Sequence, residues 1–192
     1  MERRGAREVV GFDLDEGLGY DCRLPTDQAT VAEFGRWVGM VKNGFWLAHH
    51  LLKSRVKMSY GHAGSLPVDL GWFDTVMMGN ILQHLQDPVG AVLQAIRHTD
   101  HLIITEADWL SGTGDDLPCM IMYDLPHFFS WYQVKPGLLQ ALLRRWDFSD
   151  QILTWHTQTM LQGHQFTDDG GVSWEKLGVP ARHYTLSVRR RQ

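Results

Sequence analysis

The stretch from residue 71 to residue 107 constrains the fold most, because it contains a strand pattern, a helix pattern and a second strand pattern. The apolar run Trp72–Met78 is too short for a typical helix and suits a buried strand. Asp87 and Pro88 then predict the N-cap and first residue of a helix, and a second apolar run covers His101–Ala107. Apolar residues share one face of the expected helix: Val89, Val92, Leu93 and Ile96. Such βαβ units build parallel sheets, so the sequence predicts an α/β fold.

Length and composition predict one ordinary globular domain. The chain has 192 residues, of which 44% are hydrophobic and 21% charged. No apolar run approaches the ~20 residues that span a bilayer, and the charged N-terminus lacks the apolar segment of a signal peptide, so we expect no membrane contact and a cytoplasmic location. Cys22 and Cys119 have no metal-type spacing and are expected to be free thiols. The net charge of −4 gives no general attraction to nucleic acid.

The block FDTVMMGNILQHLQDPVGAVLQAIR (residues 73–97) resembles the fourth strand and following helix of class I S-adenosylmethionine-dependent methyltransferases. Their pattern is FD, three or four apolar residues, a small or polar residue at the strand tip, then L-x-H-L-x-D-P. Within that class the chain is most similar, over residues 2–160, to the branch related to tRNA wobble-uridine (carboxy)methyltransferases and their small-molecule relatives. The resemblance implies a Rossmann-like methyltransferase fold whose mostly parallel sheet ends in a C-terminal antiparallel hairpin. It also implies S-adenosylmethionine as cofactor, and methyl transfer to an O, N or C nucleophile.

An acidic residue follows the first expected strand, Glu8–Phe12. Acids at such strand tips accept hydrogen bonds from ribose hydroxyls. The resemblance implies that Asp13, followed by Leu14, holds the cofactor ribose. Asp15 is a close alternative, and a simple turn or N-cap acid is the other reading.

Two further strand ends carry expected cofactor contacts. After the strand Arg55–Tyr60, many members of the family place an acid and an alanine against the adenine. Here His62 stands in place of that acid, so the expected contact rests on the backbone of Ala63. The resemblance also implies that three residues at the next strand tip line the cofactor pocket: Met78, Gly79 and Asn80.

The glycine-rich loop expected before the first acid is absent from the sequence. In dinucleotide-binding folds this loop lies about 20 residues before the acid, whereas Asp13 is the thirteenth residue. We therefore expect the chain to lack the loop and the first strand, through a misassigned start codon, a truncated gene or a rearranged cofactor site, and we favour the first two. Loss of a central strand leaves two strand edges without partners, which predicts marginal stability unless another segment fills the gap.

Residues 17–43 are interpreted as a connection or lid with a short helix near Thr30–Val38, followed by a separate helix at Gly44–Lys53. Neighbouring residues on a helix point about 100° apart, so His49 and His50 do not predict a metal site. Residues 2–7 are expected to end a helix at Gly5. The C-terminal part predicts a helix with a buried face formed by Leu138, Leu139, Leu142, Leu143 and Trp146, then a strand Gln151–Leu161 and an edge strand Arg182–Arg189.

Three residues are candidates for a general base that takes a proton from the methyl acceptor: His84, Glu106 and His127. His84 has the alternative role of a helix-packing or capping residue. Residues 110–135 are expected to form a cap over the substrate, which is expected to be a small molecule, with a tRNA base as the alternative. Two other functions stay open, a non-catalytic methyltransferase-like scaffold and, more weakly, a nicotinamide-dependent oxidoreductase.

Overall fold

The computed structural model describes residues 1–15, 21, 28–110, 112, 114–115, 117–123, 130–160, 165–166, 172–173 and 179–191. The chain divides into two compact units. Unit 1 comprises residues 1–72, 84–98 and 124–131, and unit 2 comprises residues 73–83, 99–123 and 132–192. The expectation of a single domain stays a prediction, and the two units are described separately below.

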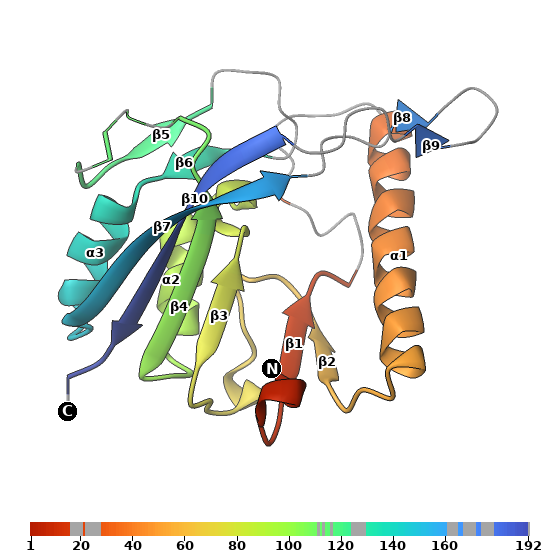
Figure 1. Cartoon of the computed structure of the whole chain (residues 1–192), viewed down its shortest axis with the longest axis horizontal. Helices are drawn as coiled ribbons and strands as arrows, with labels where there is room; N and C mark the ends of the chain where they lie inside the picture. Colours follow the sequence, from red (N-terminus) through yellow and green to blue (C-terminus); the bar gives the residue numbers. More distant parts are fainter. Residues whose placement is uncertain are drawn as a thin grey trace. The chain divides into compact units, whose positions relative to one another are not determined.

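Unit 1 contains a parallel pair of strands and two α-helices (Figure 1). Its elements are η1 (Glu2–Arg4), β1 (Val10–Asp13), α1 (Gln28–Leu51), β2 (Lys57–Tyr60), η3 (Val68–Leu70) and α2 (Pro88–Ala95). β1 and β2 pair from Val10 opposite Lys57 to Asp13 opposite Tyr60, which places their carboxyl ends side by side. Gly5 ends η1 with φ 93°, in the left-handed region that glycine adopts readily, so the predicted stop is confirmed.

One continuous helix replaces the two short helices expected near Thr30–Val38 and Gly44–Lys53. α1 runs without a break through Gly35, Gly39 and Gly44, although glycine weakens a helix interior. The polar and glycine-rich composition that suggested a connection therefore belongs, from Gln28 onward, to a regular helix. Asp21 is the one described residue between 16 and 27, so the proposed lid there lies mostly outside the described residues.

The predicted start of the helix at the final proline of the L-x-H-L-x-D-P pattern is confirmed. α2 begins at Pro88, and the Asp87 side chain accepts a hydrogen bond of 2.7 Å from the backbone N–H of Gly90. The buried residues of α2 are Pro88, Ala91, Val92 and Ala95, with Ile96 buried at its end. Of the predicted pattern, Val92 and Ile96 are therefore buried, whereas Val89 and Leu93 are only partly buried and two alanines share the buried face.

Unit 2 is built on a four-stranded sheet of order β3-β4-β10-β7 (Figure 1). Its strands are β3 (Val76–Gly79), β4 (His101–Ala107), β7 (Asp150–Met160) and β10 (Val179–Arg189). β3 and β4 are parallel, while β10 runs antiparallel to both β4 and β7. Two-stranded pairs are formed by β5 (Met120–Met122) with β6 (Tyr132–Val134), and by β8 (Gln165–Phe166) with β9 (Val172–Ser173).

The last strand lies inside the sheet, so the expectation that Arg182–Arg189 is an edge strand is wrong. β10 pairs on one side with β4 and on the other with β7, which is the edge strand. Alternation of apolar and polar residues does not distinguish an edge strand from a central strand, because a central strand with one polar face shows the same alternation. The strand expected at Trp72–Met78 begins only at Val76, and Trp72 is 58% exposed.

The core of unit 2 lies on one face of this sheet. Residues opposite one another on neighbouring strands share a face, as Ile104 and Leu186 do, and both are fully buried. α3 (Pro136–Arg144) contacts β10 and buries Leu139 and Leu143. The predicted helix is therefore confirmed, and of its predicted apolar face Leu139 and Leu143 are buried. Leu138 and Leu142 are only partly buried, and Trp146 lies beyond the end of the helix.

Among the described strands, β3 pairs only with β4, and β1 pairs only with β2. The expected absence of a central strand stays a prediction. In the described part of the chain, no helix has both the length and the apolar character needed to cross a lipid bilayer.

Candidate functional site

The carboxyl ends of β3 and β4 meet in unit 2, at the position where ligands bind in open α/β sheets. Asn80 follows β3 with φ 50°, a left-handed conformation that asparagine tolerates better than most residues. Its backbone N–H donates to Thr105 O at 2.8 Å, and its side-chain Oδ1 accepts from the Ala107 N–H at 2.8 Å. Asn80 therefore turns the chain away from β3 while it holds the end of β4.

Glu106 fixes the segment that follows this turn. Its side chain is only 2% exposed, and Oε1 accepts hydrogen bonds of 2.8 Å from the backbone N–H groups of both Ile81 and Leu82. Burial raises the pKa of Glu106 to about 7, against the opposing effect of these hydrogen bonds. Glu106 thus changes charge near neutral pH while it holds the main chain next to the β3 tip.

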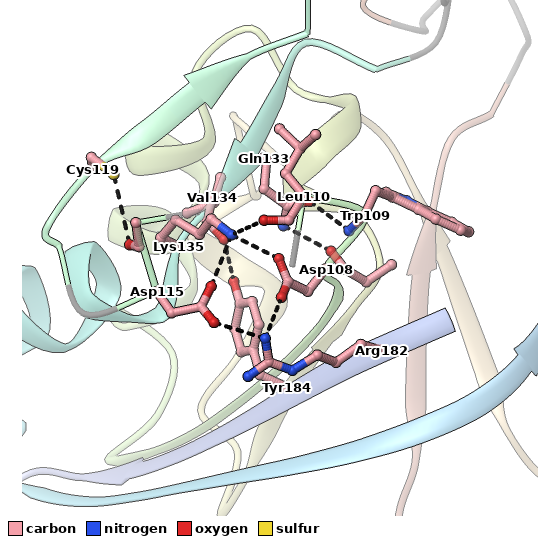
Figure 2. A network of polar contacts seen from close by, with 12 residues as sticks. Asp108, Trp109, Leu110, Asp115, Cys119, Gln133, Val134, Lys135, Arg182 and Tyr184 are labelled. Atoms are coloured by element: carbon pink, nitrogen blue, oxygen red, sulfur yellow. Dashed lines mark hydrogen bonds and ion pairs between the residues drawn. The ribbon is translucent and has the colours of Figure 1, made fainter. Parts of the chain in front are cut away.

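A four-residue ionic network lies just beyond the end of β4 (Figure 2). The ammonium group of Lys135, fully buried, donates to Asp108 Oδ1 at 2.8 Å, to Asp115 Oδ1 at 3.0 Å and to Leu110 O at 2.8 Å. Arg182 Nη1 contacts the other oxygens of the two carboxylates, at 3.2 Å for Asp108 and 2.7 Å for Asp115. The charges of the two cations and the two carboxylates cancel. The network therefore connects the end of β4, Arg182 of β10 and Lys135, the residue after β6, without adding a net charge.

The hydrogen bonds and ion pairs of Asp115 change its pKa more strongly than its burial does. Burial alone would raise its pKa, but hydrogen bonds and charge from Arg182 and Lys135 lower it. The Arg182 guanidinium also lies over the Trp155 ring, with 3.6 Å from its central carbon to the ring centroid. Arg182 and Trp155 are each 36% exposed, so this cation–π pair forms the solvent-facing side of the network.

Gln133 links the network to an exposed aromatic side chain. Its Oε1 accepts hydrogen bonds from the backbone N–H of Trp109 and from the Tyr123 hydroxyl, both at 2.9 Å. Its Nε2 donates to the backbone carbonyl of Ala107 at 2.8 Å. The Trp109 indole Nε1–H donates to Gln83 Oε1 at 3.3 Å, while the side chain remains 40% exposed. A rigidly held, partly exposed tryptophan at a strand end can contact the flat face of a small ligand.

Unit 1 has its own strand-end cluster. Asp13 is exposed at the end of β1, and its Oδ1 accepts from the backbone N–H of Leu14 at 2.8 Å. The backbone of Asp13 continues the parallel pairing, because its carbonyl accepts from the Gly61 N–H at 2.9 Å. The carboxylate retains further acceptor capacity beside the loop that follows β2.

His62 lies in that loop and faces an acid that the sequence reasoning missed. Its Nδ1 accepts from the Gly64 N–H at 3.1 Å, which leaves the proton on Nε2. This Nε2 lies 3.2 Å from Asp21 Oδ1, at an angle outside hydrogen-bond geometry. Asp21 Oδ2 also accepts from the Gln86 N–H at 2.8 Å, and its carbonyl accepts from the Trp131 indole at 2.7 Å.

The predicted site residues fall into two groups. Unit 1 holds Asp13, Leu14, His62, Ala63 and His84, and unit 2 holds Met78, Gly79, Asn80 and Glu106. Within unit 2 the structure brings the β3 tip and Glu106 into direct contact, whereas His127 lies outside the described residues. Asp15 forms a salt bridge with Lys42, in which Oδ1 and Nζ are 2.8 Å apart.

Sequence reasoning missed the polar residues of the unit 2 network and its surroundings, above all the buried Lys135 and Gln133 and the partly exposed Arg182. One signal was available for Lys135, which stands directly before the proline that begins α3. Among the described residues, no group of three or more His, Cys, Asp or Glu side chains is arranged to hold a metal ion.

Comparison with protein-family models found no match, and no curated protein matches the sequence. Solved structures do match. The N-terminal domain of EvdMO1 crystallised with SAH bound is 13% identical, with a TM-score of 0.54 over 98% of this chain and 76% of that one. The same domain in the presence of SAH and D-fucose gives 15% identity and a TM-score of 0.53 over 96% and 77% of the two chains. Together with the strand order, these likenesses show that the chain has a Rossmann-like methyltransferase fold.

Proposed function

We propose that this chain is a domain of an S-adenosylmethionine-dependent methyltransferase that acts on a small molecule. The observation that carries the proposal is the exposed Asp13 carboxylate at the carboxyl end of β1, within a methyltransferase fold. An exposed strand-tip carboxylate with spare acceptor capacity suits the two hydroxyls of a ribose. Two structural neighbours with TM-scores above 0.5 are structures of one domain crystallised with SAH, which supports the same cofactor here.

The residues of unit 1 fit the adenosine half of this cofactor. Asp13 offers acceptors for the ribose, and the loop after β2 places Ala63 next to the end of that strand. His62 replaces the acid that the family uses at this position, and its ring accepts a hydrogen bond from the backbone N–H of Gly64. We propose that the backbone of Ala63 contacts the adenine while His62 orders the loop. The sequence further predicts cofactor contacts from Met78, Gly79 and Asn80.

The methionine half of the cofactor has no assigned partner in this chain. The residues before Asp13 contain Gly5 and Gly11 but no glycine-rich loop. The adenosine contacts are therefore the part of the site that this chain can test by itself.

Methyl transfer needs alignment and at most one base. Bound S-adenosylmethionine supplies an electrophilic methyl group on its sulfonium. Among the candidate bases, Glu106 has a pKa near neutral, but its burial and its hydrogen bonds to Ile81 and Leu82 favour a positioning role for the β3 tip. His84 and His127 remain the proposed bases. The small-molecule acceptor is favoured over a tRNA base because the net charge is −4.

Calorimetric titration of this chain with S-adenosylhomocysteine tests the proposal. Asp13→Ala should weaken binding about 10- to 100-fold, the loss expected for hydrogen bonds to a charged group. Asp15→Ala, the matched control two residues away, removes a carboxylate that is already engaged by Lys42 and should change binding less than threefold. Equal losses in both variants, or unchanged binding by Asp13→Ala, would refute the assignment of Asp13.

A further inference from the structure

Asp21 contacts three segments of unit 1 that lie far from it in the sequence. Its Oδ2 accepts a hydrogen bond of 2.8 Å from the backbone N–H of Gln86, which is 65 positions away. Its backbone carbonyl accepts a hydrogen bond of 2.7 Å from the Trp131 indole, which is 110 positions away. Its Oδ1 lies 3.2 Å from Nε2 of His62. All four residues belong to unit 1, and we call them the Asp21 junction.

The ring of His62 determines the shape of the loop that follows β2. Its Nδ1 accepts a hydrogen bond of 3.1 Å from the Gly64 N–H, and the His62 carbonyl accepts one of 2.9 Å from the Ser65 N–H. The ring also packs closely against Gly64, where an added Cβ would lie 3.0 Å from Nδ1. Ala63 lies between these contacts in the chain. A change in the orientation of the His62 ring therefore moves the backbone of Ala63.

Asp21 stabilises this orientation of the His62 ring. Because Nδ1 accepts from the Gly64 N–H, the neutral ring carries its proton on Nε2. This Nε2 is buried and has no hydrogen-bond partner in the described part of the chain. A buried N–H group without an acceptor is unfavourable, and a carboxylate oxygen 3.2 Å away offsets part of that cost electrostatically. The side chains of Asp21 and His62 are only 20% and 34% exposed, so solvent screens this interaction less than it screens a surface pair.

The other two contacts of Asp21 lie in segments that are proposed to serve the methyl acceptor. Gln86 directly precedes the N-cap residue of α2 and follows His84, a proposed base, by two positions. Trp131 directly precedes β6, within residues 110–135, which the sequence predicts to cap the substrate. Asp21 thus joins the loop proposed to contact adenine with two segments on the acceptor side of the reaction.

We propose that Asp21 is a positioning residue that couples cofactor binding at the loop after β2 to the segment at Trp131. This inference rests on the proposed function, because a bound adenosine would fix the loop and with it the ring of His62. The Asp21 carboxylate faces that ring, and the Asp21 carbonyl binds the Trp131 indole, so one residue carries the effect from the first segment to the second.

Fluorine NMR of the chain labelled with 5-fluorotryptophan tests the connection without any ligand. Trp131→Phe assigns the resonance of Trp131, and His62→Ala should shift that resonance. The shift should disappear in an Asp21→Ala background, because this variant keeps the carbonyl that binds Trp131 but removes the carboxylate that faces His62. It should persist in an Asp69→Ala background, the matched control, because Asp69 is an exposed acid of the same unit outside the junction.

The remaining tryptophan resonances show whether each variant is folded. The absence of a shift at Trp131 on His62→Ala substitution would overturn the proposal. An equal shift in the wild-type and Asp21→Ala backgrounds would overturn it as well, because His62 would then act on Trp131 without Asp21.

Titration with S-adenosylhomocysteine tests the consequence for the cofactor. Asp21→Ala should weaken binding about tenfold, within the usual range of coupling between two sites, and Asp69→Ala should leave it unchanged. Asp21→Asn keeps an acceptor oxygen for the Gln86 N–H and should weaken binding less than Asp21→Ala does. The ligand should also shift the Trp131 resonance in the wild type but not in Asp21→Ala.

The two measurements separate this proposal from the proposed function. Equal binding of S-adenosylhomocysteine by the wild type and Asp21→Ala would overturn the positioning role of Asp21. An absence of binding by the wild type would instead refute the proposed function, and the ligand-free fluorine NMR would still decide whether Asp21 connects His62 with Trp131.

Discussion

Replacing Glu106 with glutamine should change how the stability of this chain depends on pH. Glu106 is 2% exposed, and its Oε1 accepts hydrogen bonds from the N–H groups of Ile81 and Leu82. Burial raises its pKa from 4.5 to about 7. Glutamine keeps an acceptor oxygen of similar position but does not titrate in this range. The variant therefore isolates the effect of the buried charge.

The sign of this pH dependence follows from the number of protons that the folded and unfolded states bind. Between pH 4.5 and about 7 the folded chain binds more protons at Glu106 than the unfolded chain, so its stabilising contribution is full below pH 4.5 and is lost as the pH rises through 7. A rise in pKa from 4.5 to about 7 corresponds to about 3 kcal/mol. Relative to the wild type, Glu106→Gln should gain about 3 kcal/mol of unfolding free energy between pH 4.5 and pH 8.

Urea unfolding of both proteins at several pH values between 4.5 and 8.5 measures this difference. Other titrating groups contribute equally to both proteins and cancel in the comparison. The amide N–H groups of the new glutamine change the unfolding free energy by the same amount at every pH, so they do not affect the pH dependence of the difference. Asp74→Asn, which removes an exposed carboxylate of the same unit, is the control for a simple change in net charge. A difference between wild type and Glu106→Gln that stays flat across this pH range would refute the reasoning.

Three further predictions concern stability. Lys135→Met should lower the unfolding free energy by about 3–5 kcal/mol in urea titrations, because it leaves the buried Asp108 carboxylate with Arg182 as its remaining cation; a loss below 1 kcal/mol would contradict this. Asn80→Ala should cost about 1–3 kcal/mol in the same assay, since alanine loses the bond to the Ala107 N–H and adopts φ 50° less readily; a neutral result would exclude that anchoring role. Calorimetry of the 192-residue chain should give a broad, low-temperature transition if a central strand is missing, whereas a sharp melt of ordinary stability would count against that expectation.

The elements with strong local signals were predictable from the sequence. The capped start of α2 follows from Asp87 and Pro88, and the bounds of β4 follow from one apolar run with a polar residue at its end. The interior position of β10 was not predictable, because alternation reports a polar second face and not the number of neighbouring strands. The continuity of α1 was missed because its glycines and polar residues weaken the local helical pattern.

The candidate site was predictable only where a residue stands at a strand end. Asp13, Asn80 and Glu106 were identified in this way. Their roles were less predictable, since only the structure reveals that Glu106 binds backbone N–H groups. The pairing of Lys135 with Asp108 joins residues 27 positions apart, and no local pattern in the sequence encodes such a contact.

Binding of S-adenosylhomocysteine is the most direct test of the proposed function. The measurement is isothermal titration calorimetry of this chain with S-adenosylhomocysteine, repeated in the presence of excess adenosine. Because Asp13 and Ala63 are proposed to contact the adenosine half, S-adenosylhomocysteine should bind and adenosine should compete for the site. An absence of binding, or binding that adenosine does not affect, would contradict the account.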